Sequence, residues 1–194
     1  RFTLAKVDDL NKLLNELKVI YRKHEMLKGL TTDFNIFKST GNKIYAEIVH
    51  SELIASLFKD KIYGDRFLFE FLKLIEIDLP SHESITKKEV KREEPTLDST
   101  GNMDLLIDFA TSNKEKFLIA IENKIYAIDH EGQIDKYRKD LKNRKKQDDR
   151  LITKLVYLTL DGSAPINSST TEDIICISYE NDIIQWLNEC IKIV

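Results

Sequence analysis

The sequence predicts a mixed α/β fold in which one central sheet is flanked by helices. Two observations point to it. The outer parts of the chain carry apolar residues at the three- and four-residue spacing of amphipathic helices, and the middle carries short apolar runs of strand length between polar turns. With 194 residues, 42% of them hydrophobic, the chain is long enough for one packed core, and it contains no internal repeat.

The first 40 residues predict a helical extension. An amphipathic helix is expected over residues 4–30, and its apolar stripe is typical of a packing or dimer surface. A homodimer formed through this helix is therefore one expectation. The rest of the chain, residues 41–194, is expected to form the main domain and to pack with the extension as one unit.

For the main domain, the sequence pattern predicts helices first, then strands, and then helices alternating with strands. Pro80 closes the initial helical region. The expected ranges are 44–58 and 63–75 for two helices, 89–93 for a charged edge strand, 103–109 and 117–122 for a hairpin, 131–146 for a helix, 154–160 and 174–178 for two strands, and 181–191 for a closing helix.

Charge and cysteine content exclude several classes of protein. Thirty Lys and Arg against 33 Asp and Glu give a formal net charge of -3, so a nucleic-acid partner must be held by a local basic patch. Cys176 and Cys190 belong to no CxxC pair, which predicts a reducing cytoplasm and no structural zinc. No apolar run has transmembrane length, so no membrane partner is expected.

The hairpin carries the most informative polar residues. Asp104 lies near the start of its first strand, and Glu122 and Lys124 lie at the end of the second. Paired strands lie about 5 Å apart, so the two carboxylates can approach each other. Hard oxygen ligands of this kind suit Mg²⁺, and alternation along the strand places Lys124 on the same face as Glu122. Metal and lysine together could activate water and neutralise a phosphoryl group.

The Glu-x-Lys pattern alone has little weight, because Glu16–Lys18 and Glu89–Lys91 match it too. Only the pair at residues 122 and 124 ends an apolar strand that follows a hairpin partner with an aspartate. From spacing and context alone, a metal site and an ordinary surface pair remain about equally open.

Residues 44–160 resemble the PD-(D/E)XK nuclease superfamily, and its RecB-like branch more closely. Asp104 and the Glu122-x-Lys124 segment match the family's hairpin, and Gln133 and Tyr137 match the Q-x-x-x-Y pattern of the following helix. The segment 47–51 resembles the E-x-x-H-S helix of some nuclease-like members. The resemblance implies a restriction-endonuclease-like αβββαβ core with a mixed sheet, and extra helices at the N-terminus, in agreement with the element order expected from periodicity.

The chain departs from the family pattern in two places. Met103 stands in place of the proline in the family's name, a replacement common in such folds. Asn102 stands where related sequences often have arginine, which leaves the phosphate contacts near the first strand of the hairpin open.

The resemblance also implies roles. Asp104, Glu122 and the main-chain carbonyl of Asn123 would bind Mg²⁺, with Mn²⁺ able to substitute. Lys124 would orient the attacking water or offset phosphoryl charge, and Glu47 would be an auxiliary acidic residue near the metal. Gln133 and Tyr137 would contact the nucleic-acid backbone or support the metal ligands; packing of Tyr137 against the sheet is the alternative.

A basic stretch follows directly on the predicted site. Residues 136–150 contain eight basic and three acidic residues, which is typical of a solvated helix end but would also bind phosphates without sequence preference. The residues expected to contact nucleic acid here are Lys136, Arg138, Lys139 and Lys142.

The sequence thus favours a metal-dependent nuclease, expected to be a DNA endonuclease of defence (phage defence included), restriction or repair. Two alternatives stay open. One is a nuclease-fold protein that no longer cuts and serves as a nucleic-acid-binding or dimerisation module. The other is a structural α/β interaction domain whose hairpin resembles the family by coincidence, in which case Asp104 and Lys124 would lie on opposite faces of the sheet.

Overall fold

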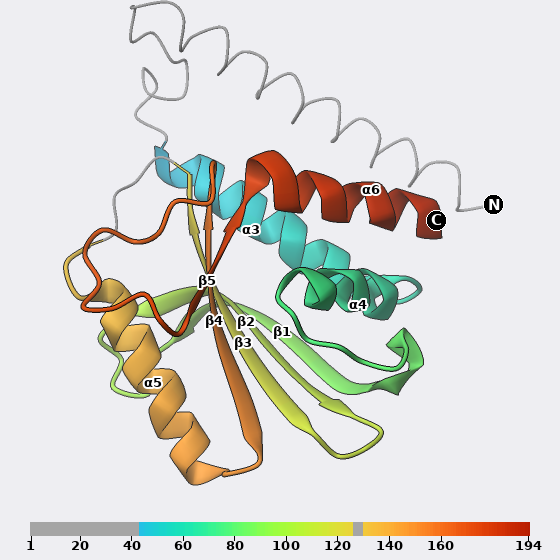
Figure 1. Ribbon diagram of the computed structural model, residues 1–194, viewed down its shortest axis with the longest axis horizontal. Coiled ribbons are helices and arrows are strands. Elements are labelled where there is room, and N and C mark those ends of the chain that lie inside the picture. The colour runs from blue at the N-terminus through green and yellow to red at the C-terminus, as the bar shows by residue number, and fades with distance from the viewer. Residues whose placement is uncertain (1–42, 126–129) are drawn as a thin grey trace, which may run out of the picture.

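The computed structural model describes residues 43–125 and 130–194, with backbone alone at residues 43–46. The helix expected over residues 4–30, the proposed dimer surface on it and the extension over residues 1–40 lie outside the described residues. The described part forms a five-stranded sheet with helices on both faces (Figure 1).

The sheet has the strand order β1-β2-β3-β4-β5, with β1 at an edge. The first three strands, β1 (Ile85–Pro95), β2 (Asn102–Thr111) and β3 (Lys116–Lys124), form an antiparallel meander. The helix α5 (Gln133–Gln147) then crosses over, so that β4 (Leu151–Thr159) and β5 (Ile174–Ser178) pair in parallel. This mixed topology confirms the α/β fold class and the expected core.

Strand β1 is longer than expected. It begins at Ile85, which is buried and pairs with Thr111, rather than near residue 89. The register shifts between Thr86 and Glu89, where Lys87 has a φ of 48°. A bulge of this kind interrupts the alternation of a strand, which explains why the sequence pattern reveals only the second half of β1.

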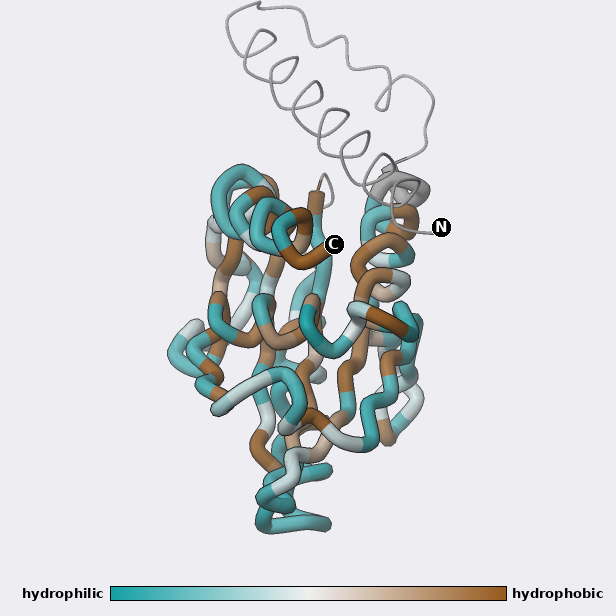
Figure 2. The backbone as a smooth tube through the Cα atoms, turned by 90° about the vertical axis from the view of Figure 1, so that its right-hand side faces the viewer, coloured by the Kyte–Doolittle hydropathy of each residue, from teal (hydrophilic) through white to brown (hydrophobic). Residues whose placement is uncertain are grey.

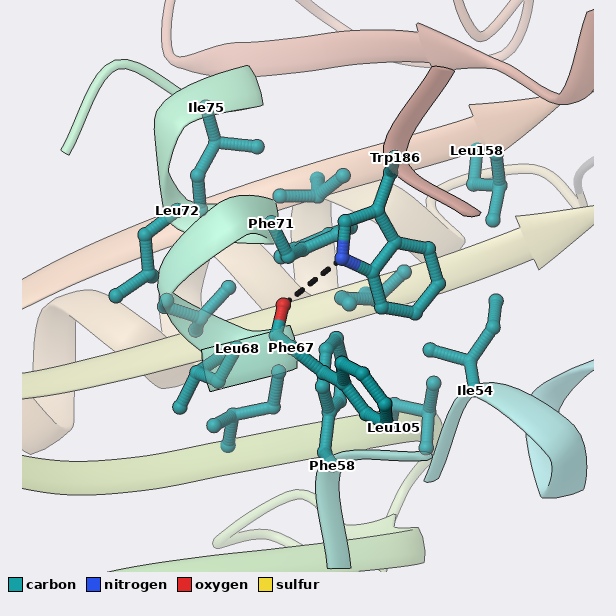
Figure 3. Close-up of a cluster of buried hydrophobic side chains, with 14 of the residues drawn as sticks. Ile54, Phe58, Phe67, Leu68, Phe71, Leu72, Ile75, Leu105, Leu158 and Trp186 are labelled. Atoms are coloured by element: carbon teal, nitrogen blue, oxygen red, sulfur yellow. Dashed lines mark hydrogen bonds between the residues drawn. The ribbon is translucent and has the colours of Figure 1, made fainter. Parts of the chain in front are cut away.

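One face of the sheet is covered by α3 (Lys43–Lys59), α4 (Gly64–Leu74) and α6 (Ile184–Ile193) (Figure 1). Phe58, Phe71 and Trp186, one from each helix, meet with ring centroids 5.2–5.6 Å apart. Nε1 of Trp186 donates to the carbonyl oxygen of Phe67 at 2.8 Å, so this indole is both buried and hydrogen-bonded (Figure 3).

Helix α5 covers the other face. Ile134, Tyr137 and Leu141 pack against alternate residues of the inner strands, and the lysines between them face solvent. The C-terminal end of α5 and the turn after it, at the lower end in Figure 1, are hydrophilic in Figure 2. Among the described residues, no helix combines the length and apolarity needed to cross a membrane.

Candidate active site

The candidate site lies at the end of the sheet at which strand β3 finishes and strand β2 starts, beside the N-terminal parts of α3 and α5 (Figure 1). The structure brings the four residues predicted to be catalytic together there. Asp104 comes from β2, Glu122 and Lys124 from β3, and Glu47 from α3. Their charges act on one another: Asp104 and Glu47 both raise the pKa of Glu122, after the larger effect of burial.

Strand alternation divides the Glu122–Asn123–Lys124 segment between the two faces of the sheet. Ala120 packs on the α5 side and Ile121 on the α3 side, so Glu122 and Lys124 continue the α5 side and Asn123 the α3 side. The hydrogen bonds agree, since Glu122 bonds to a residue of α5 and Asn123 to residues of α3.

Glu122 is 1% exposed, and its two oxygens have different surroundings. Oε1 lies 2.8 Å from Nε2 of Gln133 and 2.8 Å from Nζ of Lys124. Oε2 is buried and has no hydrogen-bond partner among the described residues. Burial, with the negative charge of Asp104, raises the pKa of Glu122 to about 8, although Lys124 opposes the shift.

Asp104 bonds to the main chain between the two predicted residues of β3. Its Oδ2 accepts the N–H of Asn123 at 2.7 Å, one step beyond the last regular pair of the two strands, Leu105 with Ile121. Burial raises the pKa of Asp104 to about 6, and the bond from Asn123 and the charge of Lys124 lower it in part. The charge of Lys124 thus acts on the carboxyl group of Asp104, so the two side chains belong to the same site.

Lys124 is a protonated donor in this arrangement. Burial alone lowers its pKa, but the carboxylates of Glu122, Asp104 and Glu47 together raise the pKa above the ordinary value for lysine. A lysine held in this way can donate hydrogen bonds and offset negative charge, but it does not accept a proton at neutral pH.

Glu47 approaches the end of β3 from the opposite face. Its Oε1 accepts the N–H of Ile125 at 3.0 Å, and its main-chain carbonyl accepts a hydrogen bond from Nδ2 of Asn123 at 3.1 Å.

His50 lies one turn further along α3, and its ring centroid is 5.3 Å from that of Tyr179. Burial lowers the pKa of His50, although Glu47 opposes this, so the imidazole is neutral at pH 7.

Gln133 and Tyr137 connect α5 to the site from one face of the helix. Gly132, with a φ of 70°, makes the turn just before α5 and brings Gln133 to Glu122. Nε2 of Gln133 lies 3.0 Å from the hydroxyl of Tyr137, which in turn donates to the carbonyl oxygen of Asn102 at 2.5 Å. Tyr137 is only 2% exposed, so the geometry favours support of the site over contact with nucleic acid.

The four basic residues expected at a nucleic-acid surface have two different environments. Lys136, Lys139 and Lys142 are exposed on the outer side of α5. Arg138 is buried: its guanidinium pairs with Asp135 at 2.8 Å and bonds to the main-chain oxygen of Thr170, so it holds the loop between β4 and β5 against α5.

The acidic residues fit a divalent metal ion. Oε2 of Glu122 is a buried acceptor without a donor, which a cation would satisfy. Within residues 43–125 and 130–194, no three His, Cys, Asp or Glu side chains are arranged to hold a metal. A site with so few carboxylates is compatible with an ion such as Mg²⁺, which is held by one or two carboxylates and otherwise by water, main-chain oxygens and substrate phosphate.

Sequence reasoning singled out the segment 47–51, which contains Ser51, but missed the contacts of the Asn123 side chain. Its amide is buried among Ser51 of α3 and Tyr179, which follows β5, and Oδ1 of Asn123 accepts the hydroxyl of Tyr179 at 3.1 Å. The four-residue spacing of Glu47 and Ser51 places both on one helix face and was an available signal. No local pattern indicates Tyr179.

One comparison with known proteins, the one with family models, gives a match. No curated protein and no solved structure matches the chain significantly. A family model described as PD-(D/E)XK nuclease superfamily matches residues 34–194, which is most of the chain and includes every site residue described above. This match confirms the resemblance to the superfamily and rules out a coincidental hairpin, while the closer resemblance to the RecB-like branch stays a prediction. Nucleases of this superfamily generally use divalent metal ions. The chain belongs to the PD-(D/E)XK nuclease superfamily.

Proposed function

We propose that this chain is a Mg²⁺-dependent nuclease that cuts DNA as an endonuclease, in the cytoplasm, in defence, restriction or repair. The observation that carries the proposal is the buried carboxyl group of Glu122 beside Lys124. One of its oxygens is bonded to Lys124 and Gln133, and the other has no partner among the described residues. Burial of this kind destabilises the metal-free protein, so a role with a bound cation explains it better than a structural role does.

In this proposal Asp104, Glu122 and the main-chain carbonyl of Asn123 would hold the metal, which when bound supplies Lewis-acid stabilisation of the phosphoryl oxygens and a more acidic water. Lys124, which is protonated, donates a hydrogen bond to the attacking water or to a phosphoryl oxygen. Gln133 keeps Glu122 in place through Oε1, and Glu47 is an auxiliary acidic residue that fixes the main chain after Lys124.

The exposed lysines of α5 would bind the phosphate backbone. Lys136, Lys139 and Lys142 lie on the helix that begins at Gln133, so a strand of nucleic acid held along α5 reaches the site. Such contacts add affinity and little sequence preference. Arg138 is not among these contacts, because Asp135 and Thr170 already occupy its guanidinium.

The test is cleavage of supercoiled plasmid, linear duplex DNA and RNA in Mg²⁺ or Mn²⁺. The wild type is compared with Glu122→Gln and Lys124→Ala, and with Lys192→Ala as a control on α6. Cleavage of circular DNA that is lost in EDTA and in both site variants, but kept in the control, supports the proposal. Cleavage of RNA alone would correct the substrate, and cleavage of ends alone would correct the mode. No cleavage by wild type would favour the binding module that no longer cuts.

A further inference from the structure

The side chain of Asn123 is the centre of a buried polar network on the α3 side of β3. Nδ2 donates to the main-chain carbonyl of Glu47 and to Oγ of Ser51, both at 3.1 Å, and Oδ1 accepts the hydroxyl of Tyr179 at 3.1 Å. Both N–H groups and the oxygen of the amide are therefore used. Asn123, Ser51 and Tyr179 are all buried, so each bond forms away from water.

The network holds a short piece of backbone from several directions. The N–H of Asn123 donates to Asp104, and the N–H of Ile125 donates to the carboxylate of Glu47. The side chain of Asn123 adds three further bonds to the same piece of chain. Residue 123 is covalently joined to Glu122 and Lys124, so any rotation of it moves both of those side chains.

Tyr179 reaches Asn123 from an irregular stretch of backbone. Residues Tyr179–Ile183 form a π-helical turn between β5 and α6, and Oγ of Ser178 caps this turn by accepting the N–H groups of Asn181 and Asp182. Single π-helical turns are rare and occur often at functional sites. Here the turn brings a tyrosine far along the chain into contact with the end of β3.

We propose that Ser51, Asn123 and Tyr179 form a positioning network that fixes the geometry of Glu122 and Lys124 for metal binding and cleavage. The proposal rests on the nuclease function proposed above. None of the three side chains is placed to touch substrate; they act through the main chain of residues 122–125. Displacement of a reacting group by about 1 Å can lower a rate about 100-fold, so such support has a measurable effect.

Two small substitutions test the network. Ser51→Ala and Tyr179→Phe each remove one hydroxyl without opening a large cavity. Ser84→Ala is the matched control, because Ser84 is also buried and bonded, to the main-chain oxygen of Ser81, but lies in the short 3-10 helix His82–Ser84 just before β1. Ser51→Thr keeps a hydroxyl and serves as the conservative variant. All four are compared in urea unfolding, amide hydrogen exchange, Mn²⁺ titration by calorimetry, and cleavage.

The expected result separates positioning from stability. Ser51→Ala and Tyr179→Phe should speed exchange of the amides of residues 123 and 125 and weaken Mn²⁺ affinity or kcat by about 10-fold or more, as other residues that support metal ligands do. Ser84→Ala should lower the free energy of unfolding about as much as Ser51→Ala does, but it should leave amide exchange at residues 123 and 125 and Mn²⁺ affinity at the wild-type values. Ser51→Thr keeps the hydroxyl, so its amide exchange and Mn²⁺ affinity should be close to those of the wild type.

Two outcomes would overturn different statements. Unchanged exchange at residues 123 and 125 in both Ser51→Ala and Tyr179→Phe would overturn the positioning network, whether or not the wild type binds metal. A wild-type chain that binds no divalent ion would instead overturn the proposed nuclease function.

Discussion

Nζ of Lys124 lies 2.8 Å from Oε1 of Glu122 on the α5 side of the sheet, where the side chain of Glu122 is 2% exposed and that of Lys124 is 11% exposed. The pair is not isolated, because the carboxylates of Asp104 and Glu47 also act on the lysine and raise its pKa. One positive charge thus faces three carboxylates. Burial favours the protonated form of Glu122 in the metal-free protein. A divalent cation bound there would favour the ionised carboxylate instead, and the lysine supplies a fixed donor next to it.

Replacement of Lys124 should separate metal binding from catalysis. Lys124→Met keeps the length of the side chain but removes its charge, so repulsion between the lysine and a bound cation disappears. Mg²⁺ affinity, measured by calorimetry, should stay the same or increase. Cleavage should fall about 100- to 1000-fold, the usual effect of removing one donor to the transition state. A loss of metal affinity as large as that in Glu122→Gln would instead make Lys124 an organiser of the metal site.

The metal-free protein should lose stability as the pH rises. The pKa of Asp104 is raised to about 6 and that of Glu122 to about 8, chiefly by burial, so the folded state holds protons that the unfolded state releases at about pH 4. The stabilising contribution is complete below about pH 4 and is lost as the pH rises through 6 and then 8. Urea unfolding in EDTA at pH 5.5 and 8.0 should show the decrease.

The variant Glu122→Gln checks the cause of this pH dependence. It removes the group with the higher pKa, so it should be more stable than wild type at pH 8 by about 1–3 kcal/mol, the cost of a buried polar group without a partner. At pH 5.5 the difference should be small. Equal pH dependence in wild type and Glu122→Gln would assign the effect to other groups.

Tyr137→Phe should affect turnover and not substrate affinity. The hydroxyl donates to the main-chain oxygen of Asn102 and lies 3.0 Å from Nε2 of Gln133, which in turn holds Glu122. Loss of the hydroxyl should cost about 1 kcal/mol of stability and lower kcat. KM for DNA should stay near the wild-type value, because Tyr137 is buried. A raised KM with unchanged kcat would place Tyr137 at the nucleic-acid surface.

The fold was largely predictable because its signals are local. The apolar runs at residues 103–109 and 117–122 and the helical spacing after residue 131 correspond to β2, β3 and α5 within a few residues. The same alternation that identifies β3 correctly places Glu122 and Lys124 on one face. The expected range falls short at β1, where a bulge interrupts the alternation, and by three residues at the start of β4, which begins at Leu151 and not at residue 154.

The surroundings of Asn123 were not predictable, for a physical reason. Its partners Ser51 and Tyr179 lie 72 and 56 residues away along the chain. Such contacts depend on how α3 and the π-helical turn pack on the sheet, and the periodicity that predicts α3 does not tell which residues of the sheet the helix contacts. Arg138 shows the same limit: composition marks it as basic and available, whereas the packing of the loop between β4 and β5 makes it buried and engaged.

The lysines of α5 should contribute to DNA affinity through charge alone. Lys136→Ala and Lys139→Ala, made in the Glu122→Gln background so that no DNA is cut, should weaken binding of unrelated duplexes to a similar degree. Each phosphate contact that is lost should lower the slope of log K against log salt concentration by about 0.9. Fluorescence anisotropy at several salt concentrations measures the affinity and the slope.

Lys192→Ala is the matched control, because Lys192 is an exposed lysine on α6, across the sheet from α5. If Lys192→Ala changes the slope as much as the α5 variants do, binding is a property of overall charge and α5 is not the nucleic-acid surface; a slope that changes only in the α5 variants places the DNA along this helix, beside Glu122.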